Sequence, residues 1–132
     1  YAVAVRVSAA GDANHLPGSA TVKVKVAVSK ASQKVAVKAK TAKLSAKALA
    51  KRAQAVKAAA VAKGVSAKTA ITYSKVGASK KSGYFKVAKN GKITVKKGLG
   101  KGTYRVTVRA TAKATSNYAK AAKNFVVKVV VK

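Results

Sequence analysis

The chain contains no cysteine, methionine or tryptophan, one proline, and a single acidic side chain, Asp12. Without cysteine it can form no disulfide and no zinc site of the cysteine type, so its stability must come from packing. Catalysis by paired carboxylates is excluded, because only one carboxylate side chain exists. We therefore expect no enzyme, no bound metal and no cofactor.

Long apolar runs are also missing. No stretch of about 20 apolar residues is present, which predicts no membrane-spanning segment. The sequence shows neither an initiator methionine nor a signal-peptide pattern, so we expect that it is not a complete precursor. Its 132 residues are enough for one compact domain with a stable core.

Basic residues dominate the charge. The chain has 30 lysine and arginine residues and a formal net charge of +29. Such a surface must be solvated and screened by salt, or neutralised by a polyanion such as nucleic acid, teichoic acid or an anionic glycan. The composition favours neither the solvated coat nor the polyanion site over the other. The residues expected to contact a polyanion are Lys23, Lys25, Lys38, Lys47, Lys51, Arg52, Arg105 and Arg109.

An internal repeat organises the chain. Tyr1–Ser29 aligns without a gap to Tyr104–Lys132 at a constant offset of 103 positions, with ten identities in 29 positions. Conservative exchanges fall in the same register, which indicates a true repeat rather than shared composition. The sequence therefore predicts that residues 1–29 are the closing strands of a preceding repeat and that residues 30–132 are a complete repeat.

The N-terminal copy has the pattern of two strands. Apolar residues alternate with small or basic residues over Tyr1–Val7 and Val22–Val28, with a polar loop between them. Left free, these strands would expose an apolar face and open edges. They could pack against the same chain or complete a sandwich in a neighbouring subunit, head to tail, and we favour the second. The expected assembly residues are Val3, Val5, Val22, Val24, Val26 and Val28.

Helix formers replace the alternation at Leu44–Gln54. Ser45 is suited to cap a short helix, and Leu44 and Leu49 are spaced to form a hydrophobic staple. The alanine-rich stretch over residues 55–62 is ambiguous and is left unassigned. A further strand is predicted over residues 69–73, followed by a polar loop over residues 74–83.

Asn90-Gly91 is a strong hairpin signal between two alternating runs. A two-residue loop would place Val87 opposite Thr94, whereas a three-residue loop would pair Val87 with Ile93 and Phe85 with Val95. We prefer the three-residue loop, with Gly91 in the left-handed conformation. The valine-rich strands near residues 104–110 and 125–131 complete the set. The number of short strands predicts an all-β fold, an immunoglobulin-like β-sandwich with one short helix.

The stretch YFKVAKNGKITVKKGLGKGTYRVTVRATA, followed by Asn117-Tyr118 and a valine-rich strand, resembles the immunoglobulin-like and cadherin-like repeats of bacterial surface proteins. The resemblance covers about residues 34–132. It implies a structural repeat of an extracellular bacterial surface or appendage protein, such as a filament or stalk. The duplicated stretch adds the expectation that the protein self-associates, as a homopolymer or as tandem repeats. Calcium-binding repeats of this kind need clustered acids, so calcium is not expected here.

Three chemical motifs are considered and disfavoured. Ser8, Asp12 and His15 could be drawn as a catalytic triad, but they lie in or beside a plain loop whose copy lacks them. The glycine-rich stretch over residues 98–103 lacks the ending of a phosphate-binding loop and precedes a strand. A lysine–asparagine isopeptide bond needs a buried acid, and Asp12 lies in a polar loop.

Overall fold

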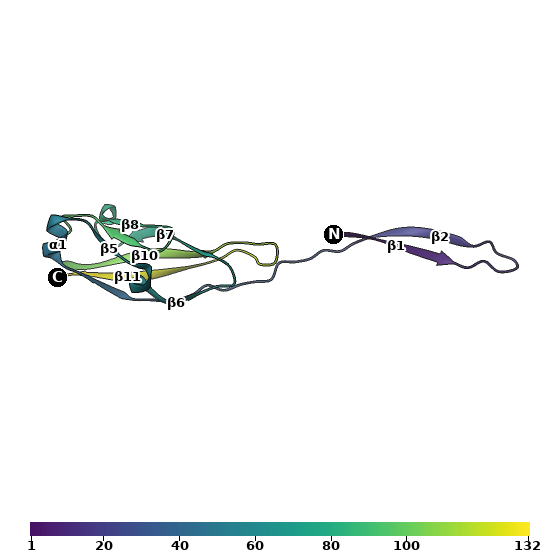
Figure 1. Ribbon diagram of the computed structural model, residues 1–132, viewed down its shortest axis with the longest axis horizontal. Helices are drawn as coiled ribbons and strands as arrows, with labels where there is room; N and C mark the ends of the chain where they lie inside the picture. Colours follow the sequence, from purple (N-terminus) through teal and green to yellow (C-terminus); the bar gives the residue numbers. More distant parts are fainter. The chain divides into compact units, whose positions relative to one another are not determined.

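The chain divides into two units. The computed structural model describes the backbone of residues 1–132 and every side chain except those of Ala59 and Ala60. Contacts separate Tyr1–Lys30 from Ala31–Lys132. The first unit is an antiparallel hairpin of β1 (Ala2–Ala9) and β2 (Gly18–Lys25) (Figure 1).

The larger sheet of the second unit has four strands in the order β4-β11-β10-β7. They are β4 (Thr41–Leu44), β11 (Ala121–Val131), β10 (Gly102–Ala112) and β7 (Ile71–Ala78). β10 pairs antiparallel with both β11 and β7, whereas β11 pairs parallel with β4. The β10–β11 hairpin therefore occupies the centre of this sheet.

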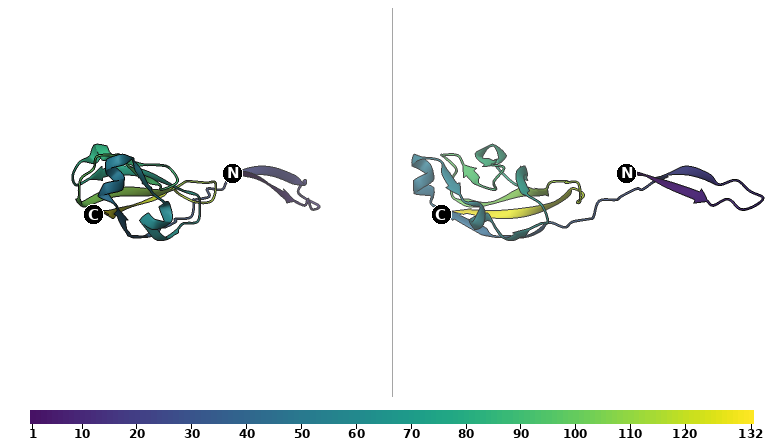
Figure 2. Two further views of the ribbon diagram at one scale, coloured as in Figure 1. Left: turned by 60° about the vertical axis from the view of Figure 1, so that its left-hand side comes forward. Right: turned by 45° about the vertical axis from the view of Figure 1, so that its right-hand side comes forward.

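Shorter strands form the rest of the sandwich. β5 (Gln54–Val56), β9 (Ile93–Val95) and β8 (Phe85–Val87) make a three-stranded sheet in the order β5-β9-β8. β3 (Ala36–Ala39) pairs with β6 (Ala62–Ser66) as a separate two-stranded sheet. Figure 2 shows the long yellow β11 of this unit from two further directions.

The core lies where the inward faces of these strands meet. Alternation buries every second residue of β10 from Tyr104 on and of β11 from Phe125 on, as the two-residue period of a strand predicts. The second unit is an immunoglobulin-like β-sandwich, so the predicted fold class is confirmed. Its largest fully buried side chains are Phe85, Leu49, Ile93, Leu99, Val95, Val106, Val108, Val127 and Val129.

The predicted helix is present as α1 (Ala46–Lys51). The Ser45 hydroxyl accepts a hydrogen bond from the Ala48 N–H at 3.3 Å and so caps the helix, while Leu49 is fully buried. Two further single turns occur, α2 (Ala58–Val61) in the stretch left unassigned and the 3₁₀ turn η1 (Ser82–Tyr84). No helix among the described residues is long and apolar enough to cross a membrane.

Two predicted strand limits are wrong. β7 runs to Ala78, through part of the expected loop over residues 74–83, because Lys75 and Ala78 pair with Val108 and Val106 of β10. β2 begins at Gly18 and ends at Lys25, so the strand predicted over residues 22–28 is shifted. Pairing with β10 therefore continues β7 into residues whose polarity had predicted a loop.

The hairpin register is confirmed. Phe85 lies opposite Val95 and Val87 lies opposite Ile93. Gly91 has a φ of 84°, in the left-handed region that glycine adopts without a steric penalty. The preferred three-residue loop was therefore the right choice.

Candidate functional site

The β1–β2 hairpin repeats the β10–β11 hairpin in structure as well as in sequence. Val3 lies opposite Val24, as Val106 lies opposite Val127 at the same offset of 103 residues. All eight pairs of the first hairpin map onto pairs of the second in this way. The connecting loops, residues 10–17 and 113–120, have equal lengths.

Equivalent faces differ completely in burial. Val106 and Val127 are fully buried, whereas Val3 is 48% and Val24 is 45% exposed. The structure places four of the expected assembly residues on one face of β1–β2, in the cross-strand pairs Val3–Val24 and Val5–Val22. Just after β2, the Val26 N–H donates a hydrogen bond to the Tyr1 carbonyl at 2.8 Å, and Val28 lies further along the chain. The whole set is exposed: Val3, Val5, Val22, Val24, Val26 and Val28.

In the second unit, neighbouring strands and an opposite sheet cover the β10–β11 hairpin. β7 pairs along the outer edge of β10 and β4 along the outer edge of β11. The buried residues Phe85, Ile93 and Val95 of the opposite sheet join Val106 and the rest of the inner face in one core. β1 and β2 form a two-stranded sheet, which is marginally stable in water when isolated.

The two ends of the second unit lie far apart. Ala31 is bonded to the loop at the tip of β10–β11, donating to the Asn117 carbonyl at 2.8 Å and accepting from Ala119 at 2.9 Å. At the other end, the Lys132 N–H donates to the Leu44 carbonyl at 3.0 Å. The 11 residues of β11 separate these sites by roughly 35 Å. Chain segments therefore enter and leave this unit at opposite ends (Figure 1).

The expected polyanion residues lie on several elements of both units. Lys47 and Lys51 lie on α1, Arg52 caps its end, and Arg105 and Arg109 lie on β10. The remaining three are spread over β2 and β3, on two different units: Lys23, Lys25 and Lys38. Each of the eight is exposed.

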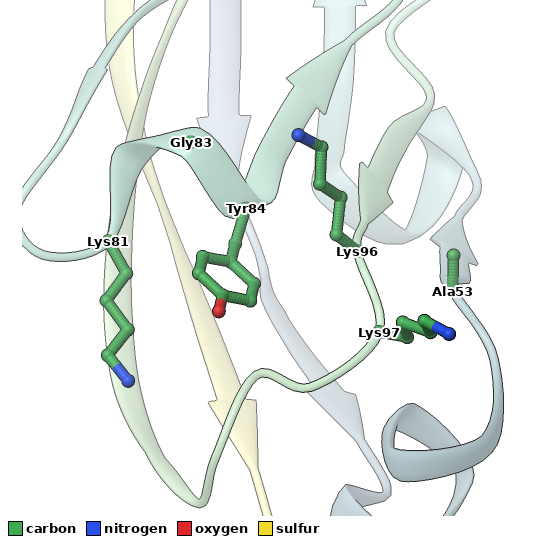
Figure 3. Close-up of a pocket in the computed structure, with 6 residues that line it drawn as sticks. All are labelled: Ala53, Lys81, Gly83, Tyr84, Lys96 and Lys97. Carbon is green, nitrogen blue, oxygen red and sulfur yellow. The ribbon is translucent and has the colours of Figure 1, made fainter.

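A basic pocket that the sequence did not indicate lies on the second unit (Figure 3). Its volume is about 670 Å³. Lys81 places its ammonium nitrogen 5.9 Å from the centre of the Tyr84 ring. No local pattern indicated this pocket, because Tyr84 lies in the 3₁₀ turn η1 and not in a strand. The lining residues are Ala53, Lys81, Gly83, Tyr84, Lys96 and Lys97.

The loop containing the one acid is a turn. Asp12 Oδ1 lies 2.8 Å from His15 Nδ1 and accepts from the Asn14 N–H at 2.9 Å. The Asn14 N–H, and after it the His15 ring, holds the pKa of Asp12 below its usual value. Ser8 is paired with Ser19 in the strand ladder. Among the described side chains, no group of three or more ligating residues could hold a metal ion.

The glycine-rich stretch over residues 98–103 leads into a strand. β10 begins at Gly102, and Gly98 has a φ of 82° in the turn before it. A phosphate-binding loop would open onto a helix N-terminus. The stretch is a strand connection, as expected.

The sheets of the second unit define an all-β, immunoglobulin-like β-sandwich with one short helix. Among solved structures, the chain is similar to human protocadherin-24 EC1-2, with a TM-score of 0.57 and 14% sequence identity. The match takes in 99% of this chain and 65% of the length of that chain. No family model and no curated protein sequence matches.

Proposed function

We propose that this chain is a structural repeat of an extracellular surface or appendage protein with an adhesion or stalk role. Its repeats follow one another in tandem, and β1–β2 is the closing hairpin of the preceding repeat. The observation that carries this proposal is that β1–β2 and β10–β11 share one register but differ in burial. The apolar face of β10–β11 is buried, whereas the equivalent face of β1–β2 is exposed.

The second unit argues for a preceding repeat rather than a separate subunit as the partner of β1–β2. Its own β10–β11 hairpin already fills the central position between β4 and β7. A hairpin from another copy could take this central position only by displacing these 11-residue strands. Tandem connection needs no such exchange.

The ends of the second unit suit a linear array. Lys132 is equivalent to Ser29 by the repeat offset, and Ala31 is already bonded to the next tip loop. Only Lys30 then lies between successive repeats in this alignment. Since each unit begins and ends at opposite ends of its long strands, repeats of this kind would build an elongated stalk.

The proposal is tested by adding, before Tyr1, the strands that a complete repeat would place around β1–β2. A second copy of residues 31–103 is joined directly before Tyr1, so that β1–β2 can complete a repeat. We expect amide exchange at Val3, Val5 and Val24 to slow by orders of magnitude, because two-stranded ladders open easily and sandwich ladders do not. A control carries the same added segment with Val3→Lys and Val24→Lys. Unchanged exchange in the first protein would refute the proposal.

Subunit-to-subunit assembly is tested separately. If the hairpin engages neighbouring copies, light scattering should show higher species for the full chain and a monomer after deletion of Tyr1–Ser29. In the tandem arrangement, the two chains differ only by the mass of the deleted segment.

A second candidate function is non-specific polyanion binding, favoured by one observation. Asp12 is the only acidic side chain and lies in the first unit, so every charged side chain of the second unit is basic. Binding to DNA or teichoic acid should then fall by orders of magnitude between about 50 and 200 mM salt, if roughly six or more phosphates are neutralised. A weak affinity that salt does not change would exclude this function.

A further inference from the structure

We propose that the pocket around Tyr84 binds an acidic sugar unit, such as a uronate within a polysaccharide, with Lys81, Lys96 and Lys97 meeting its negative charges. This site is local and does not depend on the tandem arrangement. It also differs from a diffuse basic coat, because its central element is an uncharged aromatic ring.

The fold holds the Tyr84 ring at the surface. Phe85, the next residue, is buried with its ring centre 5.7 Å from that of Tyr104. Tyr84 ends the 3₁₀ turn η1, is half-buried against the core and lines the pocket with the rest of its ring. The Lys96 N–H donates to the Tyr84 carbonyl at 2.9 Å, which fixes these two residues side by side. Gly83 adds no side chain beside the ring, so a flat ligand can approach it.

The three ammonium groups point in different directions and do not converge on one point (Figure 3). Lys81 and Lys96 lie on either side of Tyr84 in this view, and the Lys97 side chain extends further away, on the side of Ala53. A single compact anion is best bound by donors that meet at one place. An oligomer of acidic sugars has a flat apolar face on one ring and carboxylates spaced on either side, which matches this arrangement.

The rim of the pocket is held in an uncommon conformation. Lys81 has a φ of 50°, and among the described residues it is the one non-glycine position with a positive φ. The Tyr84 N–H donates to the Lys81 carbonyl at 3.0 Å, and the Lys75 ammonium donates to the Ser82 carbonyl at 3.0 Å. Strained residues of this kind concentrate at ligand sites, where the surrounding contacts keep a side chain in position.

The residues that line the pocket favour a sugar over single-stranded nucleic acid as its ligand. Proteins that bind single strands stack successive bases on several aromatic rings. Tyr84 is the one aromatic residue that lines this pocket, and its volume of about 670 Å³ is that of a small-ligand site. One ring can support one sugar unit while its neighbours lie over the lysines.

The test is calorimetric titration of the full chain with tetragalacturonate at about 150 mM salt. We expect one site per chain and no binding of an uncharged tetrasaccharide. Tyr84→Leu should weaken binding about two- to tenfold without changing the net charge. K81Q/K96Q/K97Q should weaken it by about tenfold or more. Thermal unfolding of each variant checks that the fold is intact.

A matched triple variant serves as the control. K113Q/K120Q/K123Q removes the same charge from exposed lysines at the other end of the second unit, and it should bind tetragalacturonate within about twofold of the unaltered chain. Equal losses in the two triple variants, or an unchanged affinity of Tyr84→Leu, would overturn the proposal. So would tighter binding of an oligothymidylate of equal charge, which would assign the pocket to nucleic acid.

Discussion

Val106 on β10 lies directly opposite Val127 on β11, and both side chains are fully buried. Val3 and Val24 form the same cross-strand pair in the first hairpin, where each is about half exposed. The same two residues in the same register therefore contribute very differently to stability.

The first prediction concerns these valines. Val106→Ala should lower the free energy of unfolding of the second unit by about 2–3 kcal/mol, through lost burial and the cavity left behind. Val3→Ala should change it by less than about 0.5 kcal/mol. Urea denaturation of each variant measures both. With residues 31–103 added before Tyr1, Val3→Ala should cost its own repeat as much as Val106→Ala costs the second unit. A large effect of Val3→Ala on the second unit of the present chain would contradict this account.

The second prediction separates two costs at Gly91. A Cβ there would lie 3.1 Å from the Tyr73 ring, and the φ of 84° is unfavourable for alanine. Gly98 has a similar φ of 82° with nothing within 4 Å, so it serves as the control. Gly98→Ala should cost about 1 kcal/mol from backbone strain, and Gly91→Ala about 1 kcal/mol more from crowding. Equal losses in chemical denaturation would show that crowding contributes nothing.

The third prediction concerns acid. The pKa of Asp12 is lowered in the fold, so its contribution to stability is present above the unfolded value of about 3.9 and is lost as pH falls through the folded pKa. Asp12 lies in the first unit, and the second unit has no acidic side chain. Thermal midpoints of the second unit at pH 7 and pH 3, at constant ionic strength, should nearly coincide. Asp12→Asn should leave them unchanged, and a large acid-induced loss would show that the C-terminal carboxylate is structurally important.

The fourth prediction concerns alkali. Burial raises the pKa of Tyr73. Its ring packs edge-on against the Phe125 ring, and the two ring centres lie 6.5 Å apart. Above about pH 10 the unfolded chain loses this proton before the folded chain does, so Tyr73 makes stability fall as pH rises. Tyr73→Phe should therefore lose less stability than the unaltered chain between about pH 9 and 11, measured by urea midpoints. Tyr1→Phe, which removes a phenol that is 89% exposed, should behave like the unaltered chain.

Local patterns in the sequence were enough to predict several features of the fold. The register of Phe85 with Val95 followed from alternation and from a glycine suited to the turn. Ser45 was identified as a helix cap because its hydroxyl is spaced to accept from the first turn. Both depend on interactions between residues near one another in the chain. Alternation also predicted the two strands of the first hairpin, although β2 begins earlier and ends earlier than expected.

Contacts between distant segments decided the rest. β7 extends through Lys75 to Ala78 because β10 offers hydrogen bonds along its edge, which no local pattern of residues 74–78 reveals. The pocket combines Ala53, Tyr84 and Lys97, which are brought together by the pairing of β5, β9 and β8. Burial was also decided by contacts between distant segments. Several valines stand at matching positions of β1–β2 and β10–β11. Their exposure differs because burial depends on which strands lie across from a residue.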